Sequence, residues 1–95
     1  MSESPTLYIK SGCPWCREAT SFFSQHGVAL DIRDVLSSKA DMHRMIEISG
    51  QSLTPTFEWD EFVVADFSVD EFKDALEQVP EYKKRLGLGD KEDWN

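Results

Sequence analysis

The sequence predicts an α/β fold in which a mixed sheet is flanked by helices, and three observations lead to this prediction. A short apolar run within Thr6–Lys10 has the character of a buried central strand. A helical pattern follows it at once, and a second strand and helix come next. The second half of the chain then holds two short strands separated by two residues, the pattern of a β-hairpin. A parallel strand pair with a right-handed crossover, extended by a hairpin, satisfies all three observations.

The first half of the chain alternates strand and helix. One face of the first predicted helix carries residues at helical spacing: Ala19, Phe22, Phe23 and His26. Gly27 stands where a helix C-terminus favours positive φ. Apolar residues then alternate with polar or small ones at Val28, Leu30 and Ile32, which predicts the second strand. The second helix is predicted from Ala40 to Ile48, with Gly50 closing it and one face formed by Met42, Met45, Ile46 and Ser49.

The second half of the chain predicts the hairpin and two further helices. Thr56–Trp59 and Phe62–Val64 flank Asp60-Glu61, a turn that lacks the usual glycine. Ser68 and Glu71 match a capping box, in which each residue satisfies a backbone group at the helix start. The helix after it has an apolar stripe made of Val69, Phe72, Leu76 and Val79. Residues 80–86 are predicted to form a short helix, and residues 90–95 a polar tail.

Length and composition favour a single domain spanning residues 1–95, with its core at about 6–79 and the short helix and tail at 80–95. Ten basic and eighteen acidic residues give a net charge of −8, which argues against nucleic-acid binding. No apolar run is long enough to span a membrane, and the N-terminus does not resemble a secretory signal. We therefore expect a cytoplasmic monomer that binds neither membrane nor nucleic acid.

The two cysteines of the chain form the segment Cys13-Pro14-Trp15-Cys16, between the first predicted strand and helix. Two thiols at this spacing can close and reopen a small disulfide ring. Pro14 suits the first helical turn, which places Cys13 at the helix N-terminus, where partial positive charge stabilises a thiolate. Cys16 lies one turn further in and is expected to be more buried and less acidic. The pair predicts thiol–disulfide exchange, with Cys13 as nucleophile and Cys16 as resolving thiol.

Other roles for these cysteines fit the sequence less well. A zinc site needs two more ligands, and the spacing of His26 and His43 matches no standard ligand pattern. A structural disulfide across four residues removes little chain entropy. His26 is expected to end a helix and His43 to lie on a solvated face, so neither is predicted to be catalytic. The sequence favours redox chemistry, and no metal is expected.

Two motifs together resemble those of the dithiol glutaredoxins. Lys10–Cys16 carries the CPWC segment after the first strand, and Ser49–Phe57 carries a Thr-Pro pair before the third. The likeness runs from about Thr6 to Val79. It implies a thioredoxin-like (glutaredoxin) fold with a four-stranded mixed sheet flanked by helices. It also implies glutathione as co-substrate, and as partners disulfide-containing or glutathionylated proteins, whose disulfides the enzyme reduces.

The resemblance also implies which residues surround the cysteines. Pro55 is expected to be cis and to bring the Thr54 backbone beside the active-site sulfur, where it pairs with glutathione or a substrate peptide. Lys10 is expected to stabilise the thiolate and to meet a glutathione carboxylate. For Trp15, partner contact and simple packing are equally expected. The remaining contacts with glutathione or substrate are expected from Pro14, Asp66, Phe67 and Ser68.

The chain departs from the glutaredoxin pattern at two points. Val64–Ser68 replaces a Gly-Gly pair, so that Asp66 adds negative charge near an anionic ligand, and Ser52 stands where a basic residue is usual. We therefore expect glutathione to act as a weak reductant. The same stretch resembles redoxins that accept electrons from thioredoxin reductase, which is the alternative donor. A second alternative is a dimer that carries an iron–sulfur cluster through Cys13 and glutathione.

Overall fold

The structure is a computed structural model that describes residues 4–86, so the predicted polar tail at 90–95 lies outside the described residues. The first half contains β1 (Thr6–Ile9), α1 (Pro14–Gln25), β2 (Asp31–Asp34) and α2 (Lys39–Ser49). The second half contains β3 (Thr56–Trp59), β4 (Phe62–Ala65), α3 (Val69–Glu77) and α4 (Pro80–Arg85). None of the helices within residues 4–86 has the length and apolarity needed to cross a membrane.

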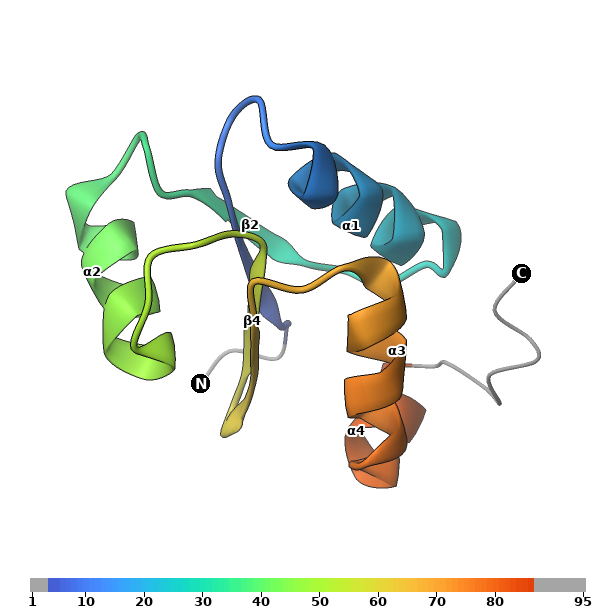
Figure 1. Cartoon of the computed structure of the whole chain (residues 1–95). Coiled ribbons are helices and arrows are strands. Elements are labelled where there is room, and N and C mark those ends of the chain that lie inside the picture. Colours follow the sequence, from blue (N-terminus) through green and yellow to red (C-terminus); the bar gives the residue numbers. More distant parts are fainter. Residues whose placement is uncertain (1–3, 87–95) are drawn as a thin grey trace.

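The strands described here form one mixed sheet in the order β2-β1-β3-β4. β1 pairs with β2 in parallel and with β3 antiparallel, and β3 pairs antiparallel with β4 across a two-residue turn. Asp60 in that turn adopts a φ of 54°, the left-handed conformation that a tight hairpin usually assigns to glycine or asparagine. Figure 1 shows α1, α3 and α4 against one face of the sheet and α2 against the other. The predicted four-stranded mixed sheet flanked by helices is confirmed.

The larger core lies between the sheet and the helices α1 and α3. Phe72 of α3 is fully buried at its centre. The ring centroids of five other phenylalanines lie 4.9 to 6.3 Å from that of Phe72: Phe22, Phe23, Phe57, Phe62 and Phe67. Edge-to-face and tilted ring pairs of this kind add to the stabilisation that burial provides. This cluster fixes α1 against the sheet and thereby fixes the N-terminus of α1, where Cys13 lies.

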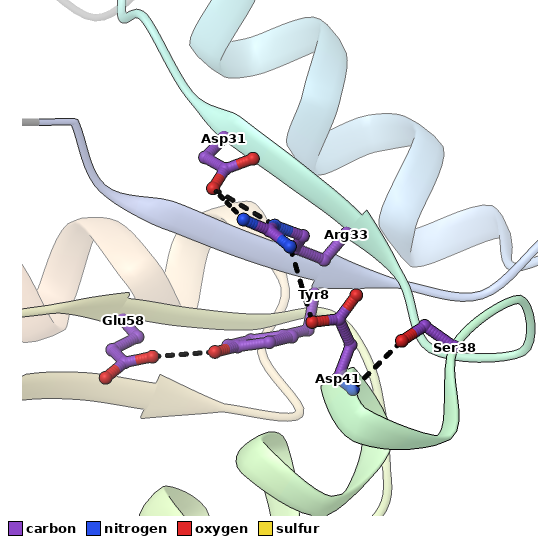
Figure 2. Close-up of polar contacts among 6 residues, drawn as sticks. All are labelled: Tyr8, Asp31, Arg33, Ser38, Asp41 and Glu58. Carbon is purple, nitrogen blue, oxygen red and sulfur yellow. Dashed lines mark hydrogen bonds and ion pairs between the residues drawn. The ribbon is translucent and has the colours of Figure 1, made fainter. Parts of the chain in front are cut away.

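A smaller core of Tyr8, Val35 and Met45 lies on the α2 side of the sheet. The Tyr8 hydroxyl donates a hydrogen bond of 2.7 Å to Glu58 Oε1, as Figure 2 shows, and Glu58 Oε2 pairs with Arg44 of α2 at 2.6 Å. Burial, together with the hydrogen bond to Glu58, raises the pKa of Tyr8 well above its usual range. The hydroxyl therefore stays protonated and keeps donating, which ties β1, β3 and α2 together.

The N-terminus of α2 is fastened to the edge strand of the sheet. Ser38 caps α2 by accepting the N–H of Asp41 at 3.2 Å. The Asp41 carboxylate pairs with Arg33 of β2 at 3.5 Å, and Arg33 also bonds Asp31 at 2.8 Å (Figure 2). Exposed ion pairs of this kind add little stability each. Together with the cap they define where the loop between β2 and α2 lies.

Two details of the predicted elements differ from the structure. β2 begins only at Asp31, so Val28 and Leu30 pack on the core from the preceding loop. Ile32 is 49% exposed because β2 is the edge strand of the sheet. In α2, Ile46 is also exposed, and Ile48 packs against the smaller core instead. The capping box at Ser68 and Glu71 and the left-handed Gly50 at the end of α2 are confirmed.

We expect Phe72→Ala to lower the free energy of unfolding by about 3–5 kcal/mol, because it removes a ring that the surrounding side chains cannot replace. The matched control is Leu36→Ala, since Leu36 is 63% exposed and its truncation should cost less than about 0.5 kcal/mol. Urea unfolding followed by circular dichroism measures both. A loss below 1 kcal/mol for Phe72→Ala would mean that this ring cluster does not hold the fold together.

Candidate active site

Cys13 lies at the exact junction where the loop after β1 meets α1 and serves as the N-cap residue of that helix. Its sulfur accepts a hydrogen bond from the backbone N–H of Cys16 at 3.2 Å. Pro14 occupies the first helical position, where it has no N–H that needs a partner. Gly12 precedes the cap with a φ of 81°, a conformation that side chains disfavour. The local sequence therefore aims the nucleophilic sulfur at the positive end of α1.

The loop before β3 brings a second set of polar atoms to the same sulfur. The Thr54–Pro55 peptide bond is cis, as the sequence resemblance implied. The Thr54 hydroxyl lies 3.7 Å from Cys13 Sγ and donates to it, and the Thr54 carbonyl oxygen lies 3.9 Å from the same sulfur. Thr54 and Pro55 are themselves buried. Residues 13 and 54, far apart in the sequence, thus meet at the end of the central strands.

The two thiols have opposite electrostatic environments. Partial burial opposes ionisation of Cys13, but hydrogen bonds from the Cys16 thiol, from backbone N–H groups and from the Thr54 hydroxyl outweigh it and lower the pKa of Cys13. Cys16 is only 3% exposed. This burial is the main reason that the pKa of its thiol is raised, and its hydrogen bond to Cys13 raises the pKa further. Both cysteines are free thiols. The geometry therefore supports an ionised Cys13 beside a protonated Cys16.

Lys10 lies near this site but bonds a different atom from the one expected. Its ammonium group donates to the backbone carbonyl of Ser52 at 2.8 Å, across the gap between the loop after β1 and the Thr54 loop. The groups that lower the pKa of Cys13 most are the Cys16 thiol and backbone N–H, followed by the Thr54 hydroxyl. Lys10 thus braces the Thr54 loop in this structure, while the helix and Thr54 donors act on the sulfur.

Sequence reasoning missed a second set of hydrogen bonds, formed by Asp34, that holds the loop preceding Cys13. The Ser11 hydroxyl donates to Asp34 Oδ2 at 2.7 Å, and the other oxygen of Asp34 accepts the N–H of Leu36 at 2.9 Å. These hydrogen bonds lower the pKa of Asp34 and keep its carboxylate ionised, and the bond from Ser11 has the largest effect. Only the parallel register of β1 and β2 brings Asp34 close to Ser11, so neither residue carries a local sequence signal.

Trp15 and the start of α3 lie on the outer side of the motif. Trp15 is 54% exposed, so it is available for contact with a partner. Pro14 and Trp15 share a groove with Ser68, the N-cap residue of α3. The groove lies between α1 and α3. The fold therefore brings three of the predicted contact residues, Pro14, Trp15 and Ser68, to one surface.

The stretch that replaces the glycine pair has a defined geometry. Asp66 is exposed and adopts a φ of 52°, so it occupies a backbone conformation that favours glycine. Phe67 is buried in the main core, and its N–H donates to the Pro55 carbonyl at 3.4 Å. Ser68 is engaged in the capping box, because its N–H donates to Glu71 Oε1 at 2.8 Å and its hydroxyl accepts the Glu71 N–H at 3.2 Å. Of these three residues, only Asp66 presents a free side chain to solvent.

No group of three or more His, Cys, Asp or Glu side chains within residues 4–86 is arranged to hold a metal ion. His26 caps the far end of α1 and packs against Phe22 in a tilted arrangement, with the ring centroids 4.7 Å apart. His43 lies exposed on α2. The histidines are therefore positioned as expected from the sequence.

The site is a redox centre of the thioredoxin-like class. Three features define it: an ionisable thiol at a helix N-terminus, a buried second thiol one turn inward and a cis-proline loop beside them. The family profile of glutaredoxin matches residues 6–64. The chain therefore belongs to the glutaredoxin family, and its family and fold indicate a thiol–disulfide oxidoreductase. A comparison with curated protein sequences gives no match.

Solved structures share the fold. The thioredoxin-like protein BC3987 is 27% identical with a TM-score of 0.69, and the alignment covers 77% of this chain and 100% of that one. The glutaredoxin from Archaeoglobus fulgidus is 19% identical with a TM-score of 0.67, covering 77% and 85%. The glutaredoxin from Brucella melitensis is 23% identical with a TM-score of 0.62, covering 87% of both chains. At below 25% identity, the last two similarities demonstrate the fold alone.

We expect Asp34→Ala to raise the pKa of Cys13, because the loop before the sulfur loses its brace and the donors to the thiolate lengthen. Asp34→Asn is the matched control, since its amide can still bond both Ser11 and the Leu36 N–H. The readout is the pH dependence of Cys13 alkylation in a Cys16→Ser background, in which the rate falls as the pH drops below the pKa of Cys13. The midpoint should move upward for Asp34→Ala and should not rise for Asp34→Asn. An equal fall in both variants would instead show that Asp34 acts on Cys13 only through its negative charge.

Proposed function

We propose that the protein is a glutathione-dependent thiol–disulfide oxidoreductase that reduces mixed or protein disulfides through Cys13 and Cys16. The observation that carries the proposal is the position of the Cys13 sulfur, which accepts the Cys16 N–H at the N-terminus of α1 and lies beside Thr54. The lowered pKa of Cys13 favours the thiolate there, and the sulfur is exposed enough to attack. Buried Cys16 supplies the second thiol within reach.

The proposed reaction proceeds in two exchanges. The Cys13 thiolate attacks one sulfur of a substrate disulfide and forms a mixed disulfide, while the other sulfur leaves as a thiolate and takes up a proton. Cys16 then loses its proton, bonds to Cys13 and releases the first substrate sulfur as a thiol. Two electrons have passed from the dithiol to the substrate. Two glutathione molecules restore the dithiol and leave as glutathione disulfide.

Several groups on this chain suit a glutathione molecule whose sulfur meets Cys13. The Thr54 main chain, before cis-Pro55, offers strand-like pairing to the cysteinyl part. At the start of α3 the capping box uses the N–H groups of Ser68 and Glu71, which leaves those of Val69 and Asp70 without a partner among residues 4–86. A carboxylate is stabilised at such a helix N-terminus. Pro14, Trp15 and Lys10 complete the proposed contact surface, with Phe67 contributing through its backbone.

Asp66 supports thioredoxin reductase as a second candidate donor. Its exposed carboxylate stands beside the place where the anionic end of glutathione would bind, and like charges within a Debye length repel. A reductase flavoprotein that presents its own cysteine pair does not require that anionic pocket. An NADPH-coupled assay run separately with glutathione plus glutathione reductase and with thioredoxin reductase distinguishes the two donors.

The division of labour between the cysteines gives a direct test of the chemistry. Cys13→Ser should abolish all activity, because it removes the nucleophile. Cys16→Ser should still remove glutathione from a glutathionylated protein, since that route needs only Cys13, but it should lose most reduction of intramolecular protein disulfides. Turnover of the two substrate types is the measurement. If both variants were equally inactive on the glutathionylated substrate, the assigned roles would be wrong.

We expect Asp66→Gly to raise kcat/KM for glutathione about two- to fivefold at low ionic strength, the size of a screened surface-charge effect. Part of the gain should fade as salt screens the repulsion, and the part due to closer backbone approach should remain. Asp60→Gly is the matched control, because Asp60 has a similar φ of 54° but lies in the turn at the opposite end of β3.

Two outcomes would contradict this account of the donor. No gain from Asp66→Gly at either salt concentration, with a native enzyme already saturated at low glutathione, would show that this loop does not limit binding. Failure of both forms with glutathione, alongside rapid turnover with thioredoxin reductase, would assign the protein to the second donor.

A further inference from the structure

A groove of about 720 Å³ runs between α1 and α3, directly beside the CPWC motif. Pro14 and Trp15 line its near end and His26 its far end, while Ser68 and Lys73 contribute the α3 wall. Neither cysteine lines it. The volume lies within the range of pockets that bind small ligands. The groove therefore continues outward from the reactive sulfur instead of forming the pocket around it.

The length of the groove exceeds what glutathione needs. It follows α1 from Pro14 to Gln25, and twelve helical residues span about 18 Å at 1.5 Å each. An extended peptide rises about 3.3 Å per residue, so the groove accommodates about five residues of chain. Glutathione attached to Cys13 through its central cysteine extends only about one residue, roughly 3.3 Å, to either side. Most of the groove would remain empty with glutathione bound.

The lining of the groove suits a polypeptide main chain. Ser21 and Gln25 on α1 are exposed, and each can both donate and accept hydrogen bonds, as an extended backbone requires. Phe22 forms an apolar part of the lining, and Lys73 lies over its ring at 5.6 Å. Beyond the start of α3, where the proposed glutathione carboxylate lies, the lining along α1 carries charges of both signs, from Arg17 and Glu18. Half-exposed Trp15 at the near end offers an aromatic contact to a residue next to the substrate disulfide.

We propose that this groove binds the extended chain of a protein substrate on one side of its disulfide, so that the enzyme favours protein disulfides over small ones. The inference rests on the proposed function, because the disulfide itself is exchanged at Cys13 and Cys16 as described above. The groove adds binding and orientation only. Contacts remote from the reacting sulfur raise kcat/KM when they hold the disulfide in position for attack.

The test uses two series of synthetic peptides with one intramolecular disulfide, extended by zero, three or six uncharged residues from the first cysteine in one series and from the second in the other. Pre-reduced protein in excess over peptide gives single turnovers, so the result does not depend on which donor regenerates the dithiol. The rate constant should rise with the length of the extension and level off once about five residues fill the groove. The gain from the shortest to the longest peptide should be about tenfold, which corresponds to a few well-placed contacts.

Ser21→Tyr fills the groove without adding charge and should remove the length dependence while leaving the rate with the shortest peptide within about twofold. Ser24→Tyr is the matched control, because Ser24 is exposed on the same helix but does not line the groove. It should keep the full length dependence. Circular dichroism and the rate with the shortest peptide report whether each variant is folded.

Each outcome bears on a distinct claim. A native rate that does not change with peptide length, or an equal loss in Ser21→Tyr and Ser24→Tyr, would overturn the groove proposal and leave the proposed function standing. Absence of any reduction, even of the shortest peptide by the native protein, would refute the proposed function itself. Length dependence along an extension from one cysteine but not from the other would support the groove and define the direction in which the substrate chain runs.

Discussion

The hydrogen bond from the Cys16 N–H to the Cys13 sulfur is the interaction on which the site depends. It makes the nucleophile the N-cap of α1, so the same atom that reacts also completes the first turn of the helix. The position of α1 is in turn set by the aromatic core around Phe72, on the same face of the sheet. A packing cluster with no reactive group therefore determines where the reactive sulfur lies.

Two loops meet at that sulfur and a third packs against one of them, and each is held by a separate contact. The loop after β1 is tied to β2 through Ser11 and Asp34, and the Thr54 loop is tied to Lys10. The backbone before α3 is tied to the Thr54 loop through Phe67 and Pro55. The side of the site that faces Cys13 is therefore tied to several parts of the chain. The groove along α1 lies on the other side.

Features that depend on neighbouring residues could be predicted from the sequence, and those that depend on the sheet could not. The cysteine pair, Pro14 and the capping box each lie within one helical turn, so their positions at the helix starts followed from spacing. The exposure of Ile32 followed from its place on an edge strand, which alternation alone does not reveal. The Ser11–Asp34 bond and the partner of Lys10 required the register of β1 and the course of the Thr54 loop. The groove could not be predicted without knowing how α1 packs against α3.

Because the helix cap and the nucleophile are one atom, oxidation and helix stability are thermodynamically linked. The thiolate is a strong acceptor for the amides at the start of α1, and a sulfur in a disulfide is a poor one. Reduction thus strengthens α1, and oxidation weakens its first turn. Stabilising the reduced form shifts the reduction potential of a dithiol toward that of an oxidant. Substitutions that change the intrinsic stability of this helix turn, even without touching sulfur, will therefore change the potential at which the protein transfers electrons.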